Sequence, residues 1–119
     1  MITEINSVQE FQQLLNINPG LFIIKFGAEW CGPCKTIERD VTAFFRGAPP
    51  QVQCAMIDID KCPTIYGYLK SRKMVNGVPA ILCYYKGNTD FVPDDFIIGA
   101  NKHELKLFFD RCIQQSLHV

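Results

Sequence analysis

The hexapeptide Trp30-Cys31-Gly32-Pro33-Cys34-Lys35 follows closely on the apolar run Leu21-Phe22-Ile23-Ile24-Lys25-Phe26. Two cysteines separated by two residues, at a turn from a strand into a helix, form a reversible dithiol–disulfide switch. The start of the helix places partial positive charge near Cys31, which favours the reactive thiolate. Gly32 keeps the turn small, and Pro33 suits the first helical turn, where no backbone N–H is needed.

The same Cys-x-x-Cys spacing occurs in zinc sites, so the two cysteines alone leave a zinc half-site or an inert pair open as alternatives. A second element supports the redox interpretation, since Gly77-Val78-Pro79-Ala80 opens another apolar run, Ile81–Tyr85. In these elements the chain resembles the thioredoxin family. The resemblance extends over nearly the full length through Phe26-Gly27-Ala28-Glu29, the Lys86-Gly87 turn and Ile98-Gly99-Ala100-Asn101.

Apolar periodicity and helix-capping signals predict an α/β chain with the element order βαβαβα, followed by two strands and a helix. Strands are expected at 2–6, 21–27, 52–59, 80–85 and 96–98, and helices at 8–17, at 33–45, from Cys62-Pro63 onward and after Asn101. This order favours a mixed sheet with helices on both faces. The resemblance implies a thioredoxin fold over residues 1–119 as a single domain, with a central mixed five-stranded sheet flanked by four helices. The site should lie at the carboxyl end of the second strand.

The composition is that of a folded domain without a charged partner, since 48% of the 119 residues are hydrophobic and the net charge is zero. This balance gives no reason to expect binding to nucleic acid or to an anionic membrane. The first residues lack a charged segment followed by an apolar one, and no apolar run approaches the roughly 20 residues of a membrane span. We therefore expect no secretory leader, a cytoplasmic location, and free thiols at four of the six cysteines.

The resemblance assigns the two motif cysteines different roles. Cys31 should attack a substrate disulfide and form a mixed disulfide, and its sulfur is expected near the surface at the helix start. Cys34 lies one turn further in. It should attack the Cys31 sulfur, release the reduced substrate and leave the Cys31–Cys34 disulfide.

Residues around the motif are expected to receive the substrate. Pro79 resembles the family's cis-proline, which faces the two cysteines and presents the backbone of Val78; an ordinary trans proline is the alternative. Trp30 would form part of the docking surface, and Asp60 matches a family acid that accepts the indole N–H, although a helix-capping role for Asp60 is equally open. The remaining members of this small apolar patch are Gly32, Pro33, Val78, Ile98, Gly99 and Ala100.

Lys25 is a departure from the family, whose commonest members carry a buried Asp there and often a Lys at the position of Met56. A Lys inside a covered strand is desolvated, so its pKa should fall. A neutral Lys25 amine could accept the Cys34 proton, whereas a charged one would stabilise the Cys34 thiolate. The alternative is that Lys25 reaches water and affects nothing. Arg39 replaces a proline that usually kinks the active-site helix.

The four cysteines outside the motif are expected to be structural, with one exception. Cys54, Cys83 and Cys112 lie on apolar strand or helix patterns and should be inert core thiols. Cys62 comes at a helix start on the active-site edge, where it is either a slow regulatory thiol or a packed one. No cluster of histidines and cysteines suggests a metal.

Three functions are compatible with these residues. The leading one is a protein-disulfide reductase of the thioredoxin type that maintains cell redox homeostasis. It would act as a monomer on disulfide-containing proteins. No cofactor-binding motif occurs, so electrons should come from an NADPH-dependent thioredoxin reductase. A disulfide oxidase or isomerase is the second possibility, favoured weakly by Lys25 and opposed by Gly32-Pro33. The third is a non-catalytic thioredoxin subunit of a larger assembly.

Overall fold

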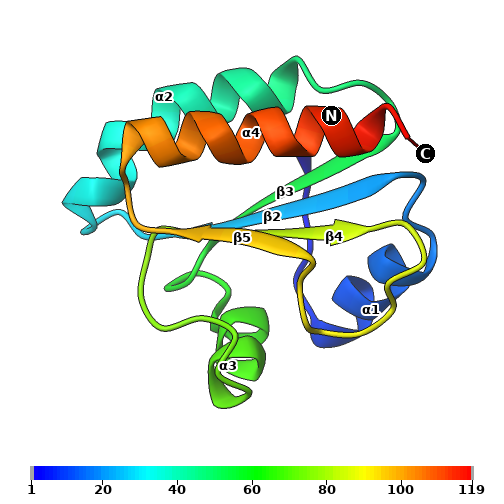
Figure 1. The fold of residues 1–119 in the computed structure, drawn as a ribbon. Coiled ribbons are helices and arrows are strands. Elements are labelled where there is room, and N and C mark those ends of the chain that lie inside the picture. The colour runs from blue at the N-terminus through cyan, green and yellow to red at the C-terminus, as the bar shows by residue number, and fades with distance from the viewer. Residues whose placement is uncertain (1, 119) are drawn as a thin grey trace.

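The computed structural model describes residues 2–118 and arranges them as a sheet covered by helices on both faces (Figure 1). The elements are β1 (Ile2–Thr3), α1 (Val8–Asn16), β2 (Leu21–Gly27), α2 (Gly32–Arg46), β3 (Val52–Asp58), α3 (Pro63–Ser71), β4 (Ala80–Tyr85), β5 (Asp95–Ile98) and α4 (Lys102–Ser116). The strand order is β1-β3-β2-β4-β5. β1 and β2 run parallel to β3, whereas β4 runs antiparallel to β2 and β5. The predicted mixed sheet is therefore confirmed.

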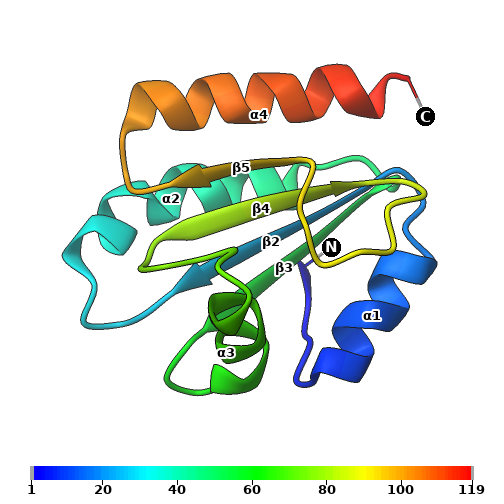
Figure 2. The ribbon, with the colours of Figure 1, turned by 60° about the horizontal axis from the view of Figure 1, so that its bottom comes forward.

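β2 is the centre of the sheet, and all seven of its residues are buried. Because side chains alternate along a strand, Phe22, Ile24 and Phe26 enter the core half that α1 and α3 cover. Leu21 and Ile23 enter the half covered by α2 and α4. Figure 1 shows these two helix pairs on opposite sides of the sheet, and Figure 2 shows α4 on the side opposite α1 and α3. The same alternation sends Lys25 toward α2.

Side-chain caps start two of the helices as the sequence indicates. The Glu10 N–H donates to Ser7 Oγ over 3.1 Å at α1, and the Glu104 N–H donates to Asn101 Oδ1 over 2.9 Å at α4. The expected strand at 2–6 is wrong beyond Thr3. Its chain leaves the edge of the sheet to reach the Ser7 cap.

α2 continues without interruption through Arg39 to Arg46, so the active-site helix has no break where the family carries a proline. The Arg72 guanidinium, directly after α3, lies 3.7 Å from the ring centroid of Tyr68 and 5.6 Å from that of Phe91. The connection after α3 therefore packs against the connection after β4. Within residues 2–118, no helix has the length and apolar character needed to cross a membrane.

Candidate active site

The two motif cysteines lie at the amino end of α2 and are joined by a disulfide bond. Cys31 is the N-cap residue, and Cys34 lies in the first turn, with 5.2 Å between the two Cα atoms. The Cys34 N–H donates to Cys31 Sγ over 3.1 Å. In the dithiol form, this donor and the positive end of the helix dipole stabilise a Cys31 thiolate.

Cys31 is less accessible than expected, since only 3% of it is exposed. In the disulfide form it packs with Ala28 and Cys34, and Ile59 and Val78 contact this cluster. The expectation of a sulfur near the surface is wrong for this state, because Val78 and the other members of this cluster cover Cys31. Cys34 is similarly buried, at 4% exposure.

The chain reversal into β4 brings Val78 and Pro79 to the disulfide, and the peptide bond between them is cis. The Val78 carbonyl oxygen lies 3.6 Å from Cys31 Sγ. The Gly99 N–H donates to the Pro79 carbonyl over 2.9 Å, which holds the end of β5 beside the start of β4. Gly99 has a φ of +94°, a conformation that favours glycine. Val78, Pro79, Ile98 and Gly99 therefore gather at one edge of the sheet.

Trp30 and Ile98 form the exposed apolar rim of this edge, at 68% and 47% exposure. The Trp30 Nε1–H donates to Asp60 Oδ2 over 2.8 Å, which fixes the indole ring beside the motif. Gly32 and Pro33 are also exposed. This rim suits the backbone and apolar side chains of a protein substrate.

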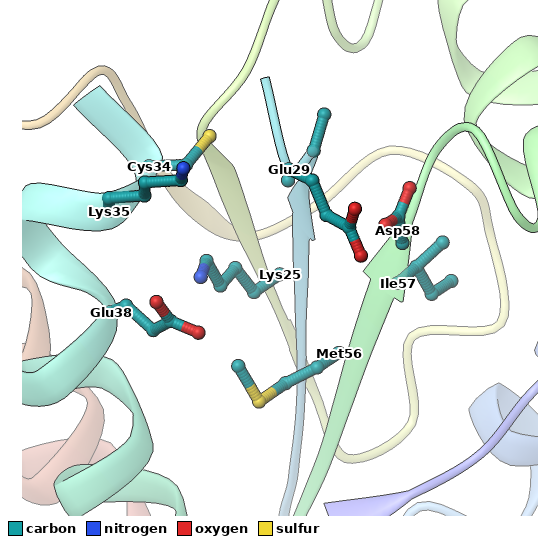
Figure 3. A pocket seen from close by; sticks show the side chains of 10 residues that line it. Lys25, Glu29, Cys34, Lys35, Glu38, Met56, Ile57 and Asp58 are labelled. Carbon is teal, nitrogen blue, oxygen red and sulfur yellow. The ribbon is translucent and has the colours of Figure 1, made fainter. Parts of the chain in front are cut away.

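A cleft of about 530 Å³ opens on the other side of Cys34, and we call it the Lys25 cleft. It is lined by Lys25, Gly27, Ala28, Glu29, Cys34, Lys35, Glu38, Met56, Ile57 and Asp58. In Figure 3 the Lys25 amine extends from β2 toward α2, between Cys34 and Glu38. The cleft gives water a path toward the buried Cys34 sulfur.

Lys25 sits in apolar surroundings on the sheet, because its neighbours on β3 and β4 are Met56 and Ile81. Burial lowers the pKa of the Lys25 amine, and the Glu38 carboxylate opposes this by raising it. A side-chain carbon at Gly27 would lie 3.6 Å from Cys34 Sγ and 3.8 Å from Lys25 Nζ. The amine and the sulfur therefore border the same small space, which Gly27 leaves open.

The cysteines outside the motif form no second disulfide within the described part of the chain. Burial raises the pKa of the Cys54 thiol to about 12, and hydrogen bonding to Cys112 together with burial raises the pKa of Cys83. Half-buried Cys62 is the N-cap of α3, and its Sγ lies 3.9 Å from the Ile5 carbonyl oxygen. No group of three histidine, cysteine, aspartate or glutamate residues within 2–118 is arranged to hold a metal ion.

Sequence reasoning missed Glu38 and Gly27 as members of the site. The signal for Glu38 was present, because a residue four positions after Cys34 on a helix lies on the same face. No sequence signal placed Gly27 beside both Lys25 and Cys34, since that juxtaposition depends on how α2 crosses β2.

The fold and the disulfide at the start of α2 place this domain in the thioredoxin-like class, with two cysteines positioned for thiol–disulfide exchange. The Thioredoxin family model matches residues 2–111, and the chain belongs to the thioredoxin family.

Known thioredoxins resemble the chain in both sequence and structure. Mitochondrial thioredoxin-3 of Saccharomyces cerevisiae is 38% identical over 64 residues, which are 54% of this chain and 49% of that protein, so the match spans about half of this relative. Thioredoxin of Equus caballus is 30% identical over 110 residues, covering 89% of this chain and 93% of that protein. The crystal structure of oxidized mitochondrial thioredoxin 3 from Saccharomyces cerevisiae superposes with a TM-score of 0.70 at 28% identity, over 92% of this chain and 94% of that chain. These relatives confirm the family and the fold predicted from the motifs.

Proposed function

We propose that the protein is a protein-disulfide reductase of the thioredoxin type. The observation that carries this proposal is the Cys31–Cys34 disulfide at the start of α2, with the Cys34 N–H donating to Cys31 Sγ over 3.1 Å. This donor stabilises a thiolate at Cys31 in preference to Cys34. Cys31 is accordingly the nucleophile, and Cys34 is the resolving thiol.

The reaction proceeds in two exchanges. The Cys31 thiolate attacks one sulfur of a substrate disulfide; the substrate S–S bond breaks, and the other substrate sulfur leaves as a thiolate and takes up a proton. Cys34 then loses its thiol proton and attacks Cys31, so that the Cys31–Cys34 bond forms and the mixed disulfide breaks. The substrate gains two electrons and two protons, and the protein ends as the disulfide.

Lys25 acts on the second exchange, in which Cys34 must lose its proton. Its amine and the Cys34 sulfur border the same space at Gly27. A neutral amine would accept the proton, whereas an ammonium would stabilise the thiolate. Lys25 is the third catalytic residue that we propose.

The exposed rim beside the disulfide binds the substrate chain, and Asp60 supports it through the indole of Trp30. Few polar groups lie on this rim, so it selects weakly among sequences. The proposed binding residues are Trp30, Gly32, Pro33, Val78, Pro79, Ile98 and Gly99.

We further propose that the partners are disulfide-containing proteins and an NADPH-dependent thioredoxin reductase, which supplies electrons to a domain that binds no cofactor itself. Four free cysteines suit a reducing compartment, and we propose the cytoplasm. Mixing the oxidised protein with NADPH and a thioredoxin reductase, then following NADPH consumption, tests the electron source. Size-exclusion chromatography tests whether the protein is a monomer.

The reduction potential of the Cys31–Cys34 couple tests the direction of exchange. A value near that of thioredoxin, roughly −270 mV, supports the reductase, whereas a value toward roughly −120 mV favours an oxidase or isomerase. Lys25 is the observation behind that second candidate, because a cation that stabilises the reduced thiolates raises the potential.

Trapping experiments test the roles of the two cysteines. Cys34→Ser should accumulate a mixed disulfide with a disulfide-bonded test protein, whereas Cys31→Ser should not. Equal trapping by both variants contradicts the proposed order of attack. Cells that retain full function with both cysteines replaced by serine would instead support a non-catalytic subunit.

A further inference from the structure

Glu38 is an unassigned carboxylate that lies one helical turn after Cys34 on α2. Both residues line the Lys25 cleft. In Figure 3 the Glu38 carboxylate and the Lys25 amine point toward one another, with Cys34 beyond the amine. Cys34 and Glu38 are four residues apart and therefore lie on the same face of α2. The Lys25 amine lies between the sulfur of one and the carboxylate of the other.

The other charged groups of the cleft are less able to act on Lys25. Glu29, from the loop after β2, pairs with Lys61 at 3.4 Å. Asp58, at the end of β3, accepts the Asp60 N–H over 2.9 Å. Lys35 of α2 is a cation and would only repel the amine.

Glu38 is left as the carboxylate whose charge acts on Lys25, and it opposes the effect of burial on the pKa of that amine. Burial alone favours a neutral amine, and a neutral amine has no positive charge that could stabilise the Cys34 thiolate. A carboxylate across the cleft favours the ammonium instead. The identity of residue 38 therefore bears on the charge that Lys25 presents to Cys34.

We propose that Glu38 is a positioning residue for the resolving exchange: it holds Lys25 as an ammonium that faces Cys34 and stabilises the Cys34 thiolate. This inference rests on the proposed function, because it concerns the step in which Cys34 attacks Cys31. The Cys34 proton passes to solvent, and the thiolate forms beside the Lys25 cation. Glu38 acts on the reaction through Lys25.

Glu38 influences Cys34 in two opposite directions. Its negative charge directly disfavours a second negative charge on the sulfur, whereas it indirectly favours the thiolate by keeping Lys25 charged. The indirect effect is the larger one, because Lys25 Nζ and Cys34 Sγ lie within 4 Å of the same point beside Gly27. Glu38 is exposed, so solvent and salt screen its charge, and this screening weakens its effect most on the sulfur, which lies beyond the Lys25 amine.

A double-mutant comparison separates these two effects. The pKa of the Cys34 thiol would be measured in the reduced protein by NMR titration of 13C-labelled cysteine. Four proteins are compared: the parent, Glu38→Gln, Lys25→Met, and the double variant. The proposal expects Glu38→Gln to raise the pKa of Cys34 when Lys25 is present and to lower it when residue 25 is Met. The resolving rate of Glu38→Gln at pH 7 should fall at least about threefold.

The control removes a carboxylate from the opposite side of the same helix. Asp40→Asn changes the net charge equally, and Asp40 lies near Lys102, at 3.9 Å, outside the Lys25 cleft. The pKa of Cys34 should be unchanged in this variant. A shift equal to that of Glu38→Gln would overturn the proposal, since it would report net charge alone.

Two further outcomes contradict the proposal. If Glu38→Gln lowers the pKa of Cys34 in both backgrounds, Glu38 acts only by direct repulsion. If it changes neither, the carboxylate is not coupled to the site. These titrations need no substrate, so they are independent of whether the protein reduces disulfides, and a reductase with an uncoupled Glu38 would leave the proposed function intact.

Discussion

Lys25 is a charged side chain in a strand whose other six residues are apolar or glycine. Only 6% of it is exposed, yet its amine reaches the Lys25 cleft. Such a residue costs stability for as long as it remains charged, because burial removes most of the hydration of the ammonium. A role in the reaction of Cys34 therefore explains the presence of a lysine at this position better than side-chain packing does.

The first prediction concerns the pH dependence of this cost. The pKa of Lys25 is lowered in the folded protein from the ordinary value of 10.5. At pH values between the lowered pKa of the folded protein and the pKa of 10.5 in the unfolded chain, the unfolded chain binds more protons than the folded protein. The free energy of unfolding of the parent therefore rises with pH in this range. Lys25→Met should therefore be more stable than the parent by on the order of 1 kcal/mol at neutral pH. This advantage should shrink as the pH rises toward 10.5.

Urea denaturation of the two oxidised proteins, at a series of pH values, measures this difference. The oxidised state is used so that Cys31 and Cys34 do not titrate. An advantage that stays constant with pH would show that the Lys25 amine is as well hydrated in the fold as in the unfolded chain.

At the scale of the element, β2 ends in a glycine that leaves space beside the active-site helix. A Cβ atom at Gly27 would meet Cys34 Sγ, Lys25 Cε and Lys25 Nζ at 3.6–3.8 Å, which is ordinary van der Waals contact. Gly27→Ala should therefore fold, and it should gain about 0.5 kcal/mol because alanine loses less conformational entropy than glycine in a strand.

The same Gly27→Ala substitution should slow the resolving exchange about threefold, because the methyl group displaces water from the charged Lys25 and Cys34 groups. Single-turnover kinetics of mixed-disulfide resolution, alongside a denaturation curve, measure both effects. A variant that is stabilised but resolves the mixed disulfide at the parent rate would show that this space plays no part in the reaction.

The start of α1 illustrates an element whose role is structural. Ser7→Ala removes the hydroxyl that accepts the Glu10 N–H and should cost about 1 kcal/mol. The reduction potential should not change, because α1 covers the face of the sheet opposite α2 (Figure 1). Ser71→Ala is the matched control, since that hydroxyl donates to the Tyr68 carbonyl at the end of α3 and accepts from the exposed Arg72 guanidinium, but from no backbone N–H. Thermal unfolding measures both variants, and equal losses would contradict the capping role of Ser7.

At the scale of the whole molecule, the sheet separates two core halves that must both be filled. Phe108 of α4 is fully buried in the core half that lies between the sheet and the helices α2 and α4. Phe108→Ala should cost about 3–5 kcal/mol, a large part of the stability of a domain of this size. Leu107→Ala, at a neighbouring position that is 39% exposed, should cost far less. Guanidinium denaturation measures both variants, and similar losses would mean that α4 is not packed as described.

Local patterns predicted most of the fold because they act over few residues. The run Leu21–Gly27, apolar except for Lys25, indicated a strand buried on both faces, and the Ser7 cap placed the start of α1. The expectation for β1 was wrong beyond Thr3, since the chain leaves the sheet there to reach the Ser7 cap, although β3 continues to Asp58. The exposure of Cys31 was also misjudged, because its burial depends on packing with Val78, 47 positions away.

The sequence by itself determined the chemistry of the protein. It contains two cysteines spaced for a disulfide, the start of a helix at those cysteines, and a proline directly before a later strand. These features are local, so covalent spacing and helix geometry are enough to define them. The resemblance to the family implied that Val78 lies beside Cys31 and that Asp60 accepts the indole N–H of Trp30, and the structure has both contacts. Only the tertiary structure decided that Glu38 faces Lys25, because this contact depends on how α2 crosses β2 beside Cys34. Side-chain direction at such crossings follows from packing, and no local pattern encodes it.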